Sequence, residues 1–334
     1  EGTVRYYGCP AEETMIGKIF MARDGIFDDL DAAITWHPFY ANTVWWCSFL
    51  SMNSFKVNFR GVPAHAAAAP HEGRSALDAA QLMDVGVNYM REHVIPEARI
   101  HCVITEGGDA PNVVPPSAQI WYYVRAPLRR QVESIYERML DIAKGADLMA
   151  GTDHQIDFVT GSYNMMPNDV LSELLLEKLE EVGPPEFTEE ERAFARELQE
   201  TFSPDCVEDA LKSYGKTREE VGDPLCDTIV EPFDRGTVLS GSTDVGDVSH
   251  VTPTAQITTC CHPLGTPLHS WQNVAAVGSS IGTKGMMLAA RAMALAVMDL
   301  ETKPDVLEAA RDEFAERTGG KPYVSPLPED VVAV

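Results

Sequence analysis

The hydrophobic pattern of residues 51–163 constrains the fold of this chain more than any other feature. An alternating run, MNSFKVNFRG, is followed by an amphipathic helical segment, two strand-like runs, a second helical segment and a last alternating run. Apolar residues at every second position indicate strands, whereas apolar residues spaced three or four positions apart indicate helices. The resulting order β-α-β-β-α-β predicts a ferredoxin-like α+β sandwich.

The segments on either side of this sandwich predict a second, discontinuous domain. Residues 1–50 contain a β-rich run, TVRYYGC, a helical segment from Glu12 to Arg23 and a short strand, AAITWHP. Residues 164–334 contain a buried strand, TAQITTCCH, and one long apolar helix over 273–300. We therefore expect an α/β domain made of residues 1–50 and 164–334, into which the sandwich of residues 51–163 is inserted.

Two further features concern the surface and the start of this α/β domain. Residues 183–235 hold fifteen acidic and six basic side chains, which predicts a solvated helical insertion. The chain opens at Glu1 directly in a β-rich run, with no turn or cap before it. We therefore expect the sequence to be truncated at its N-terminus.

The composition excludes several classes of function. Lys and Arg number 26 against 51 Asp and Glu, and the net charge of −25 repels nucleic acid and anionic lipid. The longest apolar stretch, residues 286–298, contains Arg291 and is shorter than the roughly 20 residues that span a bilayer. The seven cysteines include no CxxC pair, which argues against a disulfide framework or a structural zinc site. We expect a soluble protein of the reducing cytoplasm without nucleic-acid or membrane partners.

Acidic and histidine side chains stand at the ends of predicted elements. Glu12 and Glu13 follow the first predicted strand and His37 ends the second, so both can reach the edge where open α/β sheets bind ligands. Together with His269, before the last core helix, Glu13 and His37 form a ligand set suited to Zn, Mn or Co. Glu12 is then free to act as a general base toward water. The structural alternative is a helix N-terminus, a strand-end histidine and a helix-capping loop.

Six motifs follow one another along nearly the whole chain: GCPAEE, WHP, FRGVPAHAAAAPHEGRSALDA, APNVVP with YYVR, SGSTDVGD and PLHSWQN. In this order they resemble the M20 family of metallopeptidases and amidohydrolases, especially its aminobenzoyl-glutamate hydrolase branch. The resemblance implies an M20-type α/β catalytic domain with an inserted ferredoxin-like dimerisation or lid domain. It also implies metal-dependent hydrolysis of the amide bond in an N-acyl or N-aroyl amino acid, such as aminobenzoyl-glutamate.

The resemblance assigns a role to each matching residue. Glu12 would be the general base and Glu13, His37 and His269 would be metal ligands, in agreement with the chemistry above. His65 would reach into the active site of a dimer partner to polarise the scissile carbonyl. The structural alternative for His65 is an exposed loop histidine.

Substrate contacts are implied in two further motifs. Asn112 and Arg125 would hold a substrate carboxylate, to which a guanidinium forms bidentate hydrogen bonds. A Gly-rich loop with Ser242, Thr243, Asp244 and Asp247 would line the pocket. The structural alternatives are a turn asparagine, a surface arginine and an ordinary loop rich in Gly, Ser and Asp.

The implied cofactor is a divalent metal, Mn or Zn, with two ions per site in the family. The family's upstream ligand motifs, of the HMDG and HACGHD type, do not occur in this sequence. Three ligands remain, so we expect this chain to hold part of a two-metal site. The implied partner is either a homologous A subunit or a second copy of the chain. The competing interpretation is an inactive fragment or a non-catalytic subunit that serves dimerisation or assembly.

Overall fold

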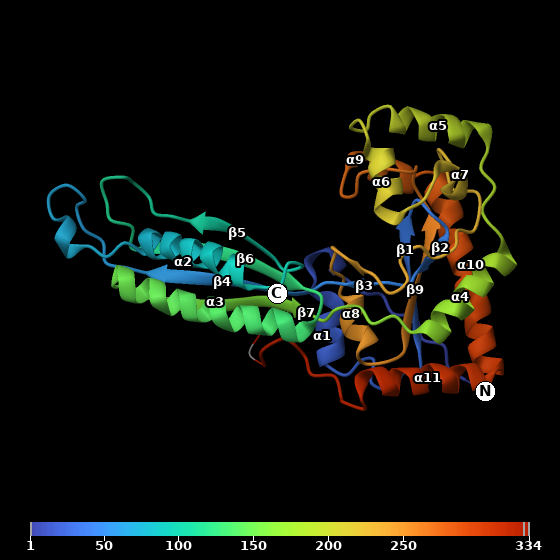
Figure 1. Ribbon diagram of the computed structural model, residues 1–334, viewed down its shortest axis with the longest axis horizontal. Coiled ribbons are helices and arrows are strands. Elements are labelled where there is room, and N and C mark those ends of the chain that lie inside the picture. The colour runs from blue at the N-terminus through green and yellow to red at the C-terminus, as the bar shows by residue number, and fades with distance from the viewer. Residues whose placement is uncertain (1, 330, 333–334) are drawn as a thin grey trace.

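The computed structural model describes residues 2–329 and 331–332, which form two bodies lying side by side (Figure 1). The first body is an elongated sandwich of a four-stranded sheet and two long helices. The second body holds a smaller sheet together with the remaining helices. The chain is therefore a mixed α/β protein, as its sequence predicts.

The elongated body lies within residues 51–162. Its strands are antiparallel in the order β5-β6-β4-β7, and α2 and α3 cover one face of the sheet. Alternation along β4 directs Phe55, Val57 and Phe59 to that face, where they are buried. This arrangement confirms the ferredoxin-like sandwich. Its elements are β4 (Ser51–Arg60), η2 (Pro70–Glu72), α2 (Ala76–Met90), η3 (Arg91–His93), β5 (Arg99–Glu106), β6 (Ser117–Ala126), α3 (Arg129–Ala150) and β7 (Asp153–Ser162).

The second body is organised around a three-stranded sheet in the order β1-β9-β2. Strand β1 runs parallel to β9, and β2 runs antiparallel to it. Helices α4 and α10 pack on this sheet through an apolar cluster that includes Leu175, Ile257 and Ala292. The elements of this body are η1 (Glu12–Thr14), α1 (Gly17–Arg23), β1 (Ala33–Phe39), β2 (Thr43–Trp45), β3 (Ser48–Phe49), α4 (Asp169–Val182), α5 (Glu189–Gln199), α6 (Cys206–Tyr214), α7 (Arg218–Val221), β8 (Val238–Leu239), α8 (Val245–Ser249), β9 (Thr254–Cys260), α9 (Trp271–Val277), α10 (Ser280–Thr302) and α11 (Pro304–Thr318).

The long helix expected over residues 273–300 is divided into α9 and α10. The break falls at Gly278, because the Ser279 side chain accepts a hydrogen bond from the backbone N–H of Ile281 and starts a new helix. Among the described residues, α10 alone is long and apolar enough to cross a membrane by length and composition. Here it packs closely on β9, since a Cβ added to Gly285 would come within 2.5 Å of the sheet. We interpret α10 as a core helix.

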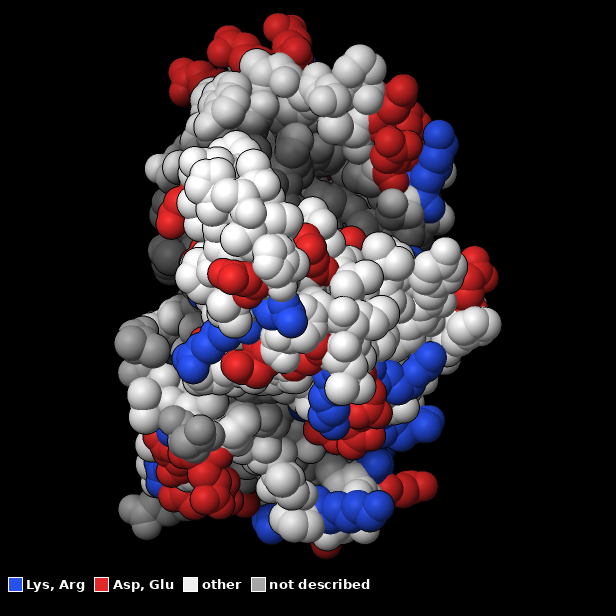
Figure 2. Space-filling model, turned by 90° about the vertical axis from the view of Figure 1, so that its left-hand side faces the viewer, with Lys and Arg blue, Asp and Glu red and all other residues white. Residues whose placement is uncertain are grey.

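The acidic segment over residues 183–235 forms helices α5, α6 and α7, as predicted, and these lie at one end of the second body (Figure 1). Acidic side chains gather at the same end of the molecule in Figure 2. The carboxylate of Glu191 accepts hydrogen bonds from Lys284 Nζ at 2.6 Å and Ser280 Oγ at 2.6 Å. These bonds tie α5 to α10.

The N-terminal segment differs from its predicted structure in two ways. Residues 3–9 are not a strand, because no neighbouring strand pairs with them among the described residues. Their β-rich side chains Val4 and Tyr6 are exposed instead of packed. The helix expected over residues 12–23 is interrupted at Met15, whose backbone is left-handed with φ 56°, and it divides into η1 and α1.

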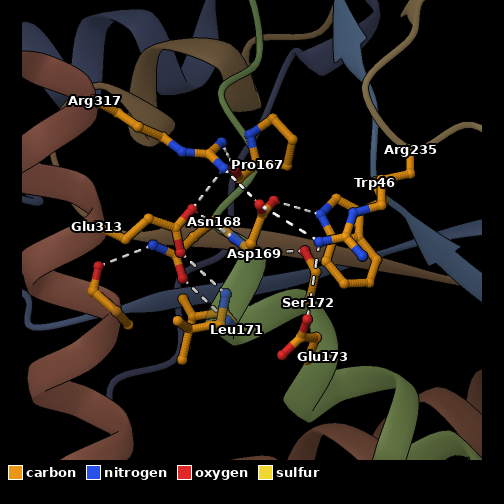
Figure 3. A network of polar contacts seen from close by, with 12 residues as sticks. Trp46, Pro167, Asn168, Asp169, Leu171, Ser172, Glu173, Arg235, Glu313 and Arg317 are labelled. Atoms are coloured by element: carbon orange, nitrogen blue, oxygen red, sulfur yellow. Dashed lines mark hydrogen bonds and ion pairs between the residues drawn. The ribbon is translucent and has the colours of Figure 1, made fainter.

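A network of polar contacts fixes the start of α4, where the chain returns from the sandwich (Figure 3). The Asn168 side chain accepts a hydrogen bond from the N–H of Leu171 at 3.0 Å and donates one to a backbone carbonyl of α11 at 2.9 Å. The Glu313 carboxylate of α11 accepts bonds from two N–H groups in the first turn of α4, where the helix dipole favours negative charge. Arg317 joins Glu313 to Asp169 with contacts of 2.8 Å each.

The segment after α11 runs back to the boundary between the two bodies (Figure 1). Leu327 is buried there in a cluster with Ile19 of α1 and Met52 of β4. The Tyr323 hydroxyl donates a hydrogen bond to Asp247 at 2.8 Å. This segment therefore contacts both bodies across their junction.

Candidate active site

Glu12 and Glu13 lie in a single 3-10 turn between two residues with a left-handed backbone, Ala11 (φ 57°) and Met15 (φ 56°). The side chain of Glu12 is half-buried and that of Glu13 is exposed. A left-handed backbone is unfavourable for residues other than glycine, so surrounding contacts must hold this turn. One such contact comes from β7, where the Thr160 hydroxyl donates to the carbonyl oxygen of Met15 at 2.5 Å.

His37 stands near the end of β1 with its ring 4.7 Å from that of Trp45. Its Nδ1 lies 2.7 Å from the carbonyl oxygen of Pro38, so Nδ1 carries the proton and the lone pair of Nε2 is free. Burial lowers the pKa of His37, while the Pro38 carbonyl and the charges of Glu12 and Glu13 act in the opposite direction. A neutral imidazole with one oriented nitrogen is the form that binds metals.

His269 lies in the loop before α9, with a left-handed backbone of φ 55°. Its Nδ1 is 3.6 Å from Oε2 of Glu13, and both side chains are 75% exposed. His269 also lies close enough to His37 to lower the pKa of His37. The structure therefore brings Glu12, Glu13, His37 and His269 into one region.

These residues do not yet form a closed metal site. Within the described part of the chain, no three His, Cys, Asp or Glu side chains converge tightly enough to hold a metal ion. The donor chemistry nevertheless fits a divalent cation, because the free Nε2 of His37 lies in the same region as a carboxylate and a second imidazole. The Glu13 and His269 side chains are largely exposed to solvent and contact each other.

The Gly-rich loop before α8 lies directly against Glu12. The Thr243 hydroxyl donates to Oε1 of Glu12 at 2.9 Å. Next to it, the buried Oγ of Ser242 has no hydrogen-bond partner among the described residues. Asp244 is fully buried and pairs with Lys18, whose Nζ is 2.7 Å from Oδ1. The loop therefore holds the glutamate turn in place.

Asp247, in the first turn of α8, belongs to the interior rather than to a pocket surface. It is fully buried, and it accepts hydrogen bonds from the Tyr323 hydroxyl at 2.8 Å and the backbone N–H of Tyr163 at 3.1 Å. Burial raises the pKa of Asp247 to about 7. The expectation that Asp247 lines the substrate pocket does not agree with this placement.

His65 and Asn112 lie together at the far end of the sandwich, in the two loops drawn furthest from the second body in Figure 1. The backbone N–H of Ala66 donates to the carbonyl oxygen of Asn112 at 2.9 Å. Nδ1 of His65 accepts from the N–H groups of Ala67 and Ala68 at 3.3 and 3.2 Å. The proton of a neutral His65 ring is therefore on Nε2, where it can be donated to another group.

Arg125 lies at the opposite end of the sandwich. Its Cα pairs with Met52 near the start of β4, whereas β6 begins at Ser117, roughly 26 Å away at about 3.3 Å per residue. Burial lowers the pKa of Arg125, and within the part of the chain that the structure describes its Nε has no hydrogen-bond partner. Within one chain, Asn112 is therefore far from Arg125 and from the turn that carries Glu12. His65, which lies beside Asn112, is also far from Glu12.

Three residues that support the site were not found from the sequence. They are Lys18, Thr160 and Tyr323, which contact Asp244, Met15 and Asp247 respectively. Lys18 and Asp244 are separated by 226 positions, so no local spacing connects them. Tyr323 lies in a Pro-rich tail and Thr160 in an alternating strand, and neither context carries a functional signal.

Comparison with known proteins agrees with the fold. The model of the M20 peptidase dimerisation domain matches residues 51–148, most of the elongated body. Together with the match described next, this places the chain in the M20 family of peptidases and amidohydrolases. Within that family it is 41% identical to the B subunit of p-aminobenzoyl-glutamate hydrolase from Escherichia coli, over 99% of this chain and 71% of that protein.

Further relatives extend the comparison. The Xaa-Arg dipeptidase of Mus musculus is 29% identical over 92% of this chain, which spans 61% of that enzyme. A Haemophilus influenzae homolog of the A subunit of p-aminobenzoyl-glutamate hydrolase is 33% identical over 53% of this chain and 43% of that protein. The crystal structure of an aminobenzoyl-glutamate utilization protein from Klebsiella pneumoniae is 20% identical, with a TM-score of 0.52 over 75% of this chain and 55% of that one. The last comparison supports the fold.

Proposed function

We propose that this chain is the major part of a metal-dependent amidohydrolase that cleaves the amide bond of an N-acyl or N-aroyl amino acid. The observation that carries the proposal is the proximity of Glu12, Glu13, His37 and His269, with the Nε2 lone pair of His37 left available by the contact of Nδ1 with Pro38. The name of the Escherichia coli relative points to aminobenzoyl-glutamate as the substrate class. The hydrolase names of the relatives do not favour the non-catalytic interpretation.

Glu13, His37 and His269 would hold a divalent metal, for which we propose Mn or Zn, with two ions in the complete site. When bound, the metal supplies Lewis acidity to the scissile carbonyl and acidifies water. Glu12 removes a proton from the attacking water and transfers it to the leaving amine. The Thr243 hydroxyl donates a hydrogen bond to Oε1 of Glu12, so Oε2 is the oxygen that accepts and releases that proton.

The remaining roles divide between the two members of a dimer. Arg125 would bind the substrate carboxylate, while Asn112 and His65 would act on the substrate in a partner's site. The partner is a second copy of this chain or a homologous A subunit, which the similarity to the Haemophilus influenzae protein supports. Pairing through the edge strand β5 and helix α2 would carry the distant loops to a neighbour. We further propose a cytoplasmic location, from the cysteine content of the chain.

Replacing Glu12 by Gln in the complete protein tests this function. The amide keeps the shape of the side chain but cannot accept a proton from water, so turnover should fall by about 10²- to 10⁴-fold. Metal content, measured by elemental analysis, should stay unchanged because Glu12 is not among the proposed ligands. Near-normal hydrolysis of acylated amino acids by this variant would show that the base is another residue.

A further inference from the structure

We propose that Thr243 is a positioning residue for Glu12 and that its hydroxyl does not contact the substrate. The inference rests on the proposed function, in which Glu12 is the general base, and it deepens that function by assigning the group that orients the base. It also corrects the expectation from sequence that Thr243 binds substrate. The argument depends on the hydrogen bonds of one hydroxyl and on the backbone of the turn that carries Glu12.

The single proton of the Thr243 hydroxyl is used within the protein. Its oxygen accepts a hydrogen bond from the backbone N–H of Val245 at 3.3 Å, and its proton is donated to Oε1 of Glu12 at 2.9 Å. A hydroxyl has one proton to donate. A substrate oxygen could therefore receive that proton only if the bond to Glu12 were broken. The observed bond instead fixes one carboxylate oxygen of Glu12 and leaves the other free.

The turn that carries Glu12 needs such support. It lies between the left-handed residues Ala11 and Met15, so its conformation depends on the contacts around it. Asp244 holds the far side of the turn, accepting bonds from both the backbone N–H and Nζ of Lys18 at 2.9 and 2.7 Å. Two adjacent residues before α8 therefore hold the segment of residues 12–18, because Thr243 bonds to the Glu12 side chain and Asp244 bonds to the Lys18 backbone. Asp244 places the segment, and Thr243 sets the orientation of the carboxylate.

Replacing Thr243 by Val or Ser in the complete, metal-loaded protein separates the possible roles. Valine keeps the branched shape but removes the hydroxyl, whereas serine keeps the hydroxyl. T243V should lower kcat on the order of tenfold with KM nearly unchanged, because a hydrogen bond to a charged group is lost. T243S should restore most of the turnover, and metal content should be the same in both variants. T283V is the matched control, since the exposed Thr283 hydroxyl bonds only to its own helix.

Two results would overturn this role of Thr243. A rise in KM with unchanged kcat in T243V would identify the hydroxyl as a substrate contact. Equal loss of kcat in T243V and T243S would show that only the methyl packing matters. E12Q is measured in parallel, and retention of turnover by E12Q would show that Glu12 is not the general base of the proposed function. In that case, faster hydrogen exchange of residues 12–18 in T243V, but not in T283V, would still show that Thr243 holds the turn that carries Glu12.

Discussion

At the scale of single residues, burial gives chemically identical groups different tasks. Asp244, at the N-cap of α8, and Asp247, within α8, lie three positions apart, and burial raises the pKa of both. Asp244 is balanced by the ammonium of Lys18, so it can remain charged while it holds the glutamate turn. Among the described residues, Asp247 accepts hydrogen bonds from neutral donors, the Tyr323 hydroxyl and a backbone N–H, while the charge of Arg129 opposes the rise in its pKa. Its protonation is therefore tied to the stability of the fold.

Asp247 should make stability depend on pH. Its pKa rises from an ordinary value of 3.8 to about 7 on folding, so the native state binds the proton more tightly between these values. The free energy of unfolding should therefore fall as the pH rises from about 4 to about 7. Asn at this position can accept from the Tyr163 N–H and donate to the Tyr323 oxygen without titrating. Urea unfolding of D247N and wild type from pH 4 to 8 should show the variant gaining relative stability, and parallel curves would contradict the assignment.

At the scale of elements, helix ends in this protein are completed by groups from distant segments. The first turn of α4 receives Asn168 as its cap and the Glu313 carboxylate from α11, in the network of Figure 3. Arg235, from the loop before β8, stacks over the Trp46 ring at 4.0 Å, and the Trp46 indole donates to Asp169. One helix terminus thus joins three regions of the second body.

Replacing Asn168 by Ala should destabilise the protein through this junction. The change removes the cap and leaves a buried carbonyl of α11 without its donor, at a cost of about 1–3 kcal/mol. Asn88→Ala is the matched control, because the exposed Asn88 side chain donates only within its own helix. Denaturant unfolding measures both variants, and equal stability of N168A and N88A would show that the network contributes little.

At the scale of the whole molecule, the length of the sandwich separates groups that the proposed reaction needs together. His65 and Asn112 lie beyond the end of β4, whose ten residues span roughly 33 Å at about 3.3 Å each, while Glu12 lies at the other body. Leu327 and Tyr323 connect the two bodies at their junction. A site that uses His65 must therefore be completed by the sandwich of a neighbouring molecule.

Mixing two inactive variants tests this shared site. His65→Ala should lower turnover by about 10²- to 10³-fold, the effect of losing an oxyanion donor, with metal content unchanged. After exchange of protomers with E12Q in the complete protein, a hybrid dimer holds one site with both groups intact. Partial recovery of hydrolysis is therefore expected. If the exchanged mixture is no more active than either parent, His65 does not act across the dimer.

Much of this protein was determined by its sequence alone, because the relevant signals are local. Period-two and helical patterns predicted β4, α2, β5, β6, α3 and β7 in their correct order, and β1 and β9 as strands. The same patterns were wrong for residues 3–9, since a strand exists only where a partner strand supplies hydrogen bonds. They also missed the breaks at Met15 and Gly278, where the backbone conformation and a serine cap interrupt helices.

In the candidate site, the sequence indicated which residues could act, whereas the contacts between them depend on the tertiary structure. Glu12, Glu13, His37 and His269 were recognisable because their residue types suit metal chemistry and they follow strands or precede a helix. The contacts of Thr243 with Glu12 and of Asp244 with Lys18 join positions more than 200 residues apart. Such pairs arise only when the folded chain packs α8 against the glutamate turn. The sequence therefore determined which groups could act, and the tertiary structure decided which of them touch and which remain at opposite ends of the molecule.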